Sequence, residues 1–149
     1  RELGLSGLAP LAPSPLDPAC GLGFVGDLPA PLPLADFLAR LGGLLGRDFW
    51  TQCGPEPASV RRVACCPGSG ASLMGAALAA GANVLITGDV KYHQAAEAPL
   101  LVIDAGHFRL EEEMMRRFAA ELSDDLAPRG VEVRFFEGRE PFTARFLRG

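Results

Sequence analysis

Two pairs of residues combine an imidazole and a carboxylate four positions apart. Asp89 and His93 lie in Thr-Gly-Asp-Val-Lys-Tyr-His, and His107 and Glu111 lie in His-Phe-Arg-Leu-Glu. Residues with this spacing fall on the same side of a helical turn. Imidazole nitrogens and carboxylate oxygens bind divalent metals, and a carboxylate can also orient an imidazole that holds a metal or moves a proton. Both pairs are therefore candidates for a metal or acid–base site.

Glu111 has an unusual place on the helix expected over residues 110–126. At about 100° per residue, it projects near the middle of the face that Leu110, Met114 and Phe118 form. A carboxylate on an apolar face is costly unless it is paired or bound to a metal. One hypothesis makes His107 and Glu111 ligands of one divalent ion; the alternative is that Glu111 reaches solvent from the first turn.

For Asp89 and His93, two interpretations also stay open. The carboxylate can orient an imidazole that binds a metal or shuttles a proton. Alternatively, Asp89 caps the short helix expected over residues 92–97, and His93 is a surface residue. A third loop, residues 67–72, has glycines that would let backbone amides approach an anion, although a plain tight turn is the alternative.

The elements that must position these loops alternate between strands and helices. Apolar runs predict strands over residues 21–27, 49–53, 60–66, 83–87, 100–105 and 131–136. Helical spacing predicts helices over residues 34–45, 71–80, 92–97 and 110–126. This alternation is typical of an α/β domain with a mixed, mainly parallel sheet flanked by helices. Ligands of such sheets bind beyond the carboxyl ends of the strands, so we expect the three loops to share one site.

Composition narrows the classes of protein. The 149 residues suit one domain, which we place at residues 21–149 after a proline-rich linker or arm over residues 1–20. The net charge of −4 argues against a dedicated nucleic-acid binder. The uncharged stretch 63–88 is broken by Pro67 and Gly81, so we expect no membrane span. Four cysteines without a Cys-x-x-Cys pattern predict free thiols in a cytoplasmic protein.

These motifs resemble those of the Nif-three-like (Ngg-one-interacting-factor-like) family, also called GTP cyclohydrolase I type 2 homologues or dinuclear-metal-centre proteins. The resemblance rests on four segments in the family's order: residues 21–28, 62–72, 86–93, and 103–107 with Glu111. Two positions differ, because Leu110 stands where the family usually has Thr and Pro67 where it usually has a small residue.

The resemblance implies that this chain is the C-terminal half of a longer protein. In the family, two intertwined α/β halves form a subunit, and subunits form a ring-shaped homohexamer. The resemblance also implies a site for two divalent ions (Zn, Mn or Fe), in which His107 and Glu111 match two ligands and the others belong to the first half. Asp89 and His93 match residues close to the metals, and we expect catalytic roles for them.

The expected function is that of a divalent-metal-binding protein, with metal-dependent hydrolysis of an unknown small molecule as the activity. The alternatives are a non-catalytic assembly or regulatory module with structural metals, and a truncated chain that keeps only the fold. We also expect self-association, because several apolar residues have no evident cover: Leu8, Leu11, Leu16, Phe135, Phe136, Phe142 and Phe146. Neither nucleic acid nor a membrane is an expected partner.

Overall fold

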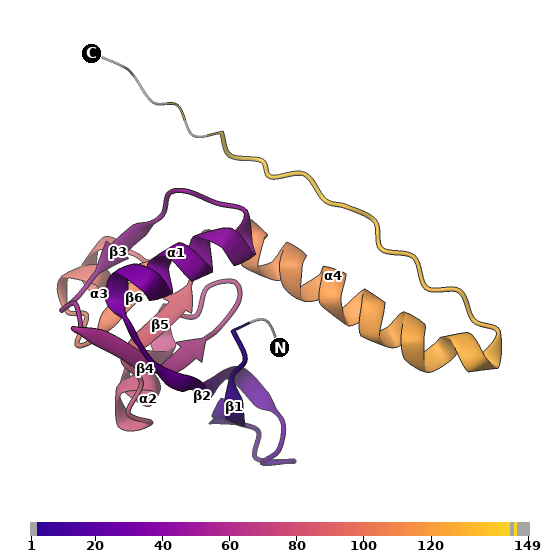
Figure 1. Ribbon diagram of the computed structural model, residues 1–149, viewed down its shortest axis with the longest axis horizontal. Coiled ribbons are helices and arrows are strands. Elements are labelled where there is room, and N and C mark those ends of the chain that lie inside the picture. Colours follow the sequence, from indigo (N-terminus) through magenta and orange to yellow (C-terminus); the bar gives the residue numbers. More distant parts are fainter. Residues whose placement is uncertain (1–2, 144, 146–149) are drawn as a thin grey trace.

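The computed structural model describes residues 3–143 and residue 145, which form one mixed sheet with helices on both faces (Figure 1). The strands are β1 (Ser6–Pro13), β2 (Gly21–Pro33), β3 (Thr51–Cys53), β4 (Ser59–Cys65), β5 (Val84–Thr87) and β6 (Leu101–Asp104). The helices are α1 (Leu34–Leu45), α2 (Met74–Ala79), α3 (Tyr92–Ala96) and α4 (His107–Leu126), with the 3-10 turns η1 (Ala71–Leu73) and η2 (Ala127–Arg129).

The sheet has the strand order β1-β2-β4-β5-β6-β3. The central strands β4, β5 and β6 are parallel, whereas β1, β2 and β3 add antiparallel pairings at the two sides. The predicted mixed α/β class is confirmed, with the parallel pairing confined to the centre. Cys65 pairs with Ile86, and Ile86 with Ile103, so the three central strands end side by side. Their loops therefore emerge at one edge.

Two hydrophobic cores lie on opposite faces of the sheet. Phe37 of α1 belongs to one core together with Val84 and Ile86, and Met74 of α2 belongs to the other together with Leu85. Successive strand residues point to opposite faces, which explains why neighbours in β5 enter different cores. All four residues of β5 are buried, as expected for a central parallel strand covered by helices on both sides.

Helix α1 has the predicted bounds. Its buried residues Phe37 and Leu41 follow the helical spacing of the sequence. Gly46 ends the helix in the left-handed conformation (φ 56°), and its N–H donates to the Gly42 carbonyl. Glycine adopts this conformation without steric cost, so the helix stops where the sequence indicates.

Within the proline-rich N-terminal segment that we expected to be a linker or arm, residues 6–13 form the strand β1 of the sheet. Residues of β1 pair antiparallel with β2, for example Pro10 with Phe24 and Pro13 with Gly21. An edge strand tolerates proline at positions where the N–H would face away from the neighbouring strand, and β1 is an edge strand. Leu11 is buried in the core that contains Met74, whereas Leu8 and Leu16 stay exposed.

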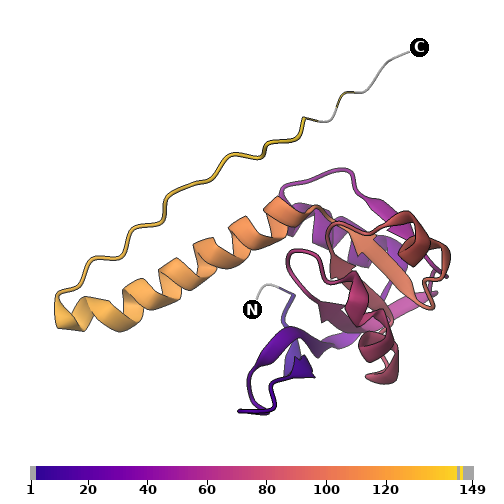
Figure 2. The same cartoon turned by 180° about the vertical axis from the view of Figure 1, so that it is seen from behind.

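The strand predicted over residues 131–136 is wrong. This segment has no regular secondary structure and runs back beside α4 (Figures 1 and 2). Arg116 pairs with Glu137 at 2.6 Å, and the Gly138 N–H donates to Glu112 at 2.7 Å. Through these contacts the segment packs against α4 and not against a strand of the sheet. Phe146, which we expected to need cover, lies outside the described residues.

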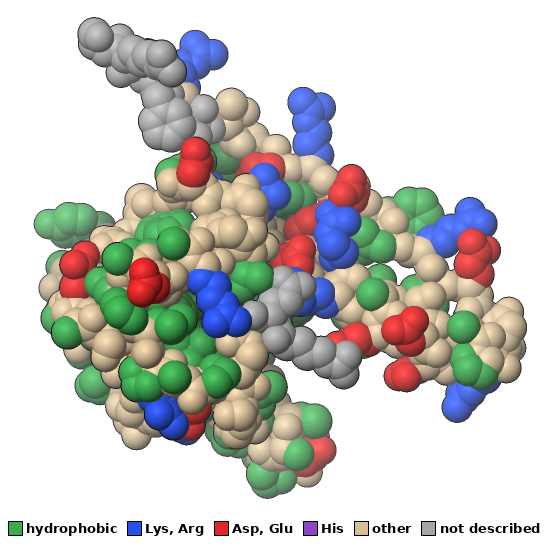
Figure 3. Space-filling model, in the orientation of Figure 1, with side chains coloured by type: hydrophobic (Ala, Val, Ile, Leu, Met, Phe, Trp, Pro, Cys, Tyr) green, Lys and Arg blue, Asp and Glu red, His purple; other side chains and the backbone are tan. Residues whose placement is uncertain are grey.

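Helix α4 leaves the body of the domain after its first turn (Figure 2). Leu110 is its one buried residue among the described side chains, while Met114 and Phe118 are about half exposed. Acidic, basic and apolar side chains are intermixed on this arm in Figure 3. Among the described residues, no helix combines the length and the apolar character that crossing a membrane requires.

Candidate metal site

The loops after β4, β5 and β6 are joined to one another by backbone hydrogen bonds. The Gly88 N–H donates to the Gly68 carbonyl at 2.8 Å, and the Ala105 N–H donates to the Thr87 carbonyl at 2.8 Å. The parallel register aligns the strand ends, and these bonds then fix each loop against the next. The three predicted loops therefore do meet at one edge of the sheet.

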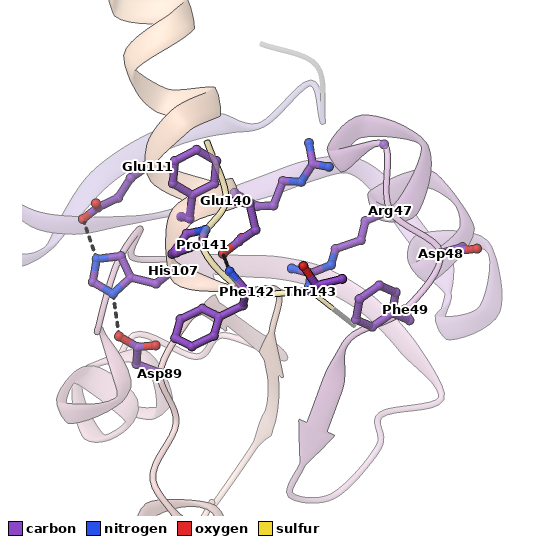
Figure 4. A pocket seen from close by; sticks show the side chains of 14 residues that line it. Arg47, Asp48, Phe49, Asp89, His107, Glu111, Glu140, Pro141, Phe142 and Thr143 are labelled. Carbon is purple, nitrogen blue, oxygen red and sulfur yellow. Dashed lines mark hydrogen bonds and ion pairs between the residues drawn. The ribbon is translucent and has the colours of Figure 1, made fainter. Parts of the chain in front are cut away.

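His107 lies at the centre of a chain of three side chains (Figure 4). Its Nδ1 is 2.5 Å from Oδ2 of Asp89, and its Nε2 is 3.2 Å from Oε1 of Glu111. The hydrogen bond with Asp89 is the main cause that raises the pKa of His107, and the nearby charge of Glu111 adds to it. A proton therefore competes with a metal for this imidazole at a higher pH than it would for a free histidine.

Glu111 is close to His107, as the sequence predicts, but it is not buried. Its side chain is 48% exposed, since α4 turns away from the domain. The cost of burying an unpaired carboxylate therefore does not apply here. What remains in favour of the metal hypothesis is the contact with the imidazole.

Gly68 brings the first loop against this pair. It has a φ of 72°, and a Cβ at this position would lie 2.6 Å from Oε1 of Glu111 and 3.4 Å from Nε2 of His107. The amide of Gly70 donates to Oγ1 of Thr87 at 2.8 Å, so it already has a partner within the protein. The loop therefore acts as a tight turn that packs over His107 and Glu111, which favours the second interpretation of residues 67–72.

Asp104 fixes the relative position of the other two loops. One carboxylate oxygen accepts the Val90 N–H at 2.9 Å, and the other accepts the Gly106 N–H at 3.0 Å. These amides follow Asp89 and precede His107, respectively. Asp89 itself has a φ of 55°, the one positive value at a non-glycine position in the described part of the chain. Asp104 thus holds the strained residue and its imidazole partner together.

His93 is not part of this arrangement. It lies exposed on α3 and forms no hydrogen bond or ion pair with the described residues of the site. Helix α3 begins at Tyr92 with Lys91 as its N-cap residue, so Asp89 does not cap it either. The structure therefore separates the predicted pair: Asp89 contacts His107 and His93 faces solvent.

An open cleft of about 910 Å³ lies beside His107. Its lining comes from the segment after α1, the loop after β5, the start of α4 and residues 140–143 (Figure 4). Arg47 and Phe49 belong to this lining, and no motif or spacing in the sequence singles out either of them. The volume is within the usual range of small-molecule sites.

The geometry can be tested against the needs of a metal. Bonds of about 2.0–2.2 Å at a tetrahedral angle place two ligand atoms roughly 3.4 Å apart. The 3.2 Å between Nε2 of His107 and Oε1 of Glu111 fits this spacing. The described residues contain no group of three or more His, Cys, Asp or Glu side chains that could hold a metal ion. The chain thus offers two ligands and an orienting carboxylate, which is an incomplete site.

Two known proteins with similar sequences share one description. A protein from Streptomyces coelicolor described as a GTP cyclohydrolase 1 type 2 homolog is 33% identical over 153 residues, which cover 95% of this chain and 54% of that protein. The homolog of the same description from Deinococcus radiodurans is 35% identical over 107 residues, covering 70% of this chain and 40% of that protein. The chain thus spans about half the length of the Streptomyces relative.

Solved structures show the same relationship. A Bacillus cereus protein related to NIF3 superposes with a TM-score of 0.73 and 27% identity, covering 87% of this chain and 37% of that one. Reduced HcgD from Methanocaldococcus jannaschii gives a TM-score of 0.64 and 26% identity, covering 84% and 49%. The family profile described as Duf34/NIF3 (NGG1p interacting factor 3) matches residues 1–141. The chain belongs to the DUF34/NIF3 family.

Proposed function

We propose that this chain provides part of a divalent-metal site and that the protein it belongs to is a metal-dependent hydrolase. The observation that carries the proposal is the placement of His107 between two carboxylates at the carboxyl ends of parallel strands. His107 and Glu111 would hold the metal, which when bound would act as a Lewis acid and activate water. Its remaining ligands would come from the half of the protein that this chain does not span.

The protein's own residues would prepare this site. Asp89 engages Nδ1 of His107, which leaves Nε2 to face a metal and fixes the orientation of the ring. Glu111 contributes a carboxylate that is half exposed and so needs little reorganisation to bind a cation. His93 could move protons only through solvent, since it has no direct contact with His107 among the described residues.

Loss of His107 should weaken metal binding, whereas loss of the other histidine should not. We expect the isolated chain to bind Zn²⁺ or Mn²⁺ weakly, because two protein ligands do not close a site. His107→Ala should lower that affinity by at least about tenfold, the usual scale for a lost ligand or its support. Competition titration with a chromogenic chelator measures both constants.

His93→Ala is the matched control, because it removes the one other imidazole of the chain from an exposed helix. The proposal is wrong if both variants lose affinity equally or if neither does. Tight stoichiometric binding that survives dialysis would contradict the inference that the site is incomplete.

We also propose that the chain self-associates. A second candidate function, that of an assembly module, rests on the same apolar surface as this proposal. An apolar groove of about 610 Å³ lies between β1, β2, α1 and α4. Its walls include Leu5, Phe24, Leu44, Met114 and Phe118. Large open apolar surfaces mark sites of protein association. The homohexamer that the family resemblance implies is the assembly we propose for the whole protein.

The size of the particle that the chain forms in solution should therefore depend on the concentration of the protein. Sedimentation over a hundredfold range should show dimers or larger closed species, and Phe118→Ser should shift the population towards monomer. Tyr92→Ser is the control, since Tyr92 is 89% exposed on α3 and does not line the groove. A monodisperse monomer throughout would overturn the proposal.

As the compartment of the protein we propose the cytoplasm, which the four free cysteines support.

A further inference from the structure

Arg47 is held in a fixed position on the wall of the cleft. Its Nη1 donates to the Ala105 carbonyl at 2.5 Å, and its guanidinium lies over the ring of Phe49 at 4.4 Å. Gly106 has a φ of 90°, and a Cβ there would overlap Nη1. The backbone is therefore shaped to let the guanidinium approach, which anchors one end of this side chain before any ligand arrives.

The charge of Arg47 is not neutralised by a carboxylate. Among the described residues it forms the hydrogen bond to Ala105 and the contact with Phe49, and no ion pair. Asp48 also lines the cleft, but its carboxylate points away from the Arg47 guanidinium in Figure 4. The Glu140 carboxylate accepts the N–H of Phe142 at 3.2 Å. A half-buried guanidinium with one of its five N–H donors in use retains donors for a ligand.

Arg47 lies close in space to the proposed metal ligand His107. The carbonyl that it contacts belongs to Ala105, two residues before His107, and both side chains line the same cleft. Planar guanidinium groups bind carboxylates and phosphates through two parallel hydrogen bonds, and an aromatic ring beneath the guanidinium leaves that edge free. Arg47 therefore places a positive charge on one wall of the cleft, and His107 lies on another part of the same cleft.

We infer that Arg47, supported by Phe49, forms an oxyanion-binding subsite beside His107 that takes a phosphate or carboxylate group of the ligand. That this ligand is the substrate rests on the proposed hydrolase function; anion binding itself does not. Phe49 supplies a flat apolar surface beside the anion. Phe142, 83% exposed on the other rim of the cleft, offers a second apolar surface for the rest of the molecule.

The experiment uses the whole chain freed of metal with a chelator that is then removed. Inorganic phosphate and acetate are added separately in NMR titrations, which read the backbone amides of Phe49 and Gly106 and the Nε–H of Arg47. We expect saturable shifts at these groups for at least one probe, and the comparison of the two probes tells whether the subsite prefers phosphate or carboxylate. Because no metal is present, a failure of the proposed metal function leaves this result unchanged.

Variants then assign the effect to the side chain. Arg47→Gln should weaken binding by at least about tenfold, because it removes a charged donor from the ligand. Arg61→Gln, which removes an equal charge from an exposed position on β4, should leave the affinity unchanged. Arg47→Lys keeps the charge but loses the planar fork, so it should bind with intermediate affinity. It also provides a variant for comparison if Arg47→Gln does not fold.

Three outcomes would overturn the inference. The first is the absence of saturable binding of either anion to the unaltered chain. The second is an equal loss in the Arg47 and Arg61 variants, which would indicate a general charge effect. The third is binding that appears only after Zn²⁺ is added and persists in Arg47→Gln, because the metal would then be the anion site.

Discussion

Replacing Gly88 by alanine is expected to lower the free energy of unfolding by about 2–3 kcal/mol, the scale of overpacking in a closely packed site. A Cβ on Gly88 would lie 2.5 Å from the backbone nitrogen of His107, 2.7 Å from its Cα and 2.9 Å from the carbonyl carbon of Gly106. These are backbone atoms, so no side-chain rotation can relieve the overlap. The loop after β5 would have to move away from the start of α4.

Urea denaturation measures this loss, and Gly43→Ala serves as the control. Gly43 lies in α1, and a Cβ at this position would have no neighbouring atom within 4 Å. Alanine there should be neutral or stabilise the protein by about 0.5–1 kcal/mol, as usual within a helix. If Gly88→Ala retained the stability of the unaltered chain, the close packing of the loop after β5 against the start of α4 would be incorrect.

The second large effect is expected at Thr87, the buried polar residue at the end of β5. Its hydroxyl accepts the Gly70 N–H at 2.8 Å and donates to the Gly68 carbonyl at 3.2 Å. Valine has nearly the same shape but can form neither bond. Thr87→Val should therefore lower the free energy of unfolding by about 1–3 kcal/mol, because the amide of Gly70 loses its partner.

Thr51→Val on β3 is the matched control, since this threonine is exposed and the substitution keeps its strand propensity. Thermal unfolding compares the two variants, and hydrogen exchange reports the protection of the Gly70 amide. Equal stability of both variants, together with a protected Gly70 amide in Thr87→Val, would show that the hydroxyl does not hold the loop over His107 and Glu111.

The elements that the sequence predicts best are those whose pattern is local. Helix α1 combines a clear helical spacing with a glycine at its end, and its bounds agree with the prediction. The central strand β5 is a short apolar run between turn residues, which predicts a buried strand without reference to its neighbours. Such signals need no knowledge of tertiary contacts.

The elements that were missed depend on neighbouring strands. The prolines of β1 argue against regular structure, yet an edge position accepts them. Strand β2 continues to Pro33, past the expected end at residue 27, because Leu32 and Pro33 pair with Val60 and Ser59 at the start of β4. Residues 131–136 satisfy a strand pattern but have no strand beside them in the described part of the chain.

The residues of the candidate site also fall into two groups, those whose position the sequence predicts and those whose position depends on tertiary contacts. Asp89, His107 and Glu111 could be predicted to meet because each follows a strand of a parallel sheet, and the structure brings them together. Asp104 acts through bonds to two backbone amides, and Arg47 reaches the site from 58 residues away. No spacing rule describes such contacts. The metal-binding and catalytic roles of these residues stay predictions.

Helix α4 is anchored in the body of the domain at one end only. Its 20 residues extend over about 30 Å, yet burial in the domain is confined to Leu110 in the first turn. Isolated helices of this length are marginally stable in water, and the returning segment adds mainly exposed contacts such as the ion pair of Arg116 with Glu137, which contribute little. The outer turns therefore open at a small free-energy cost, independently of the global unfolding of the domain. His107 and Glu111 flank the anchoring residue. The helix can therefore unwind from Leu126 inwards, as a separate cooperative unit, while both side chains keep their positions.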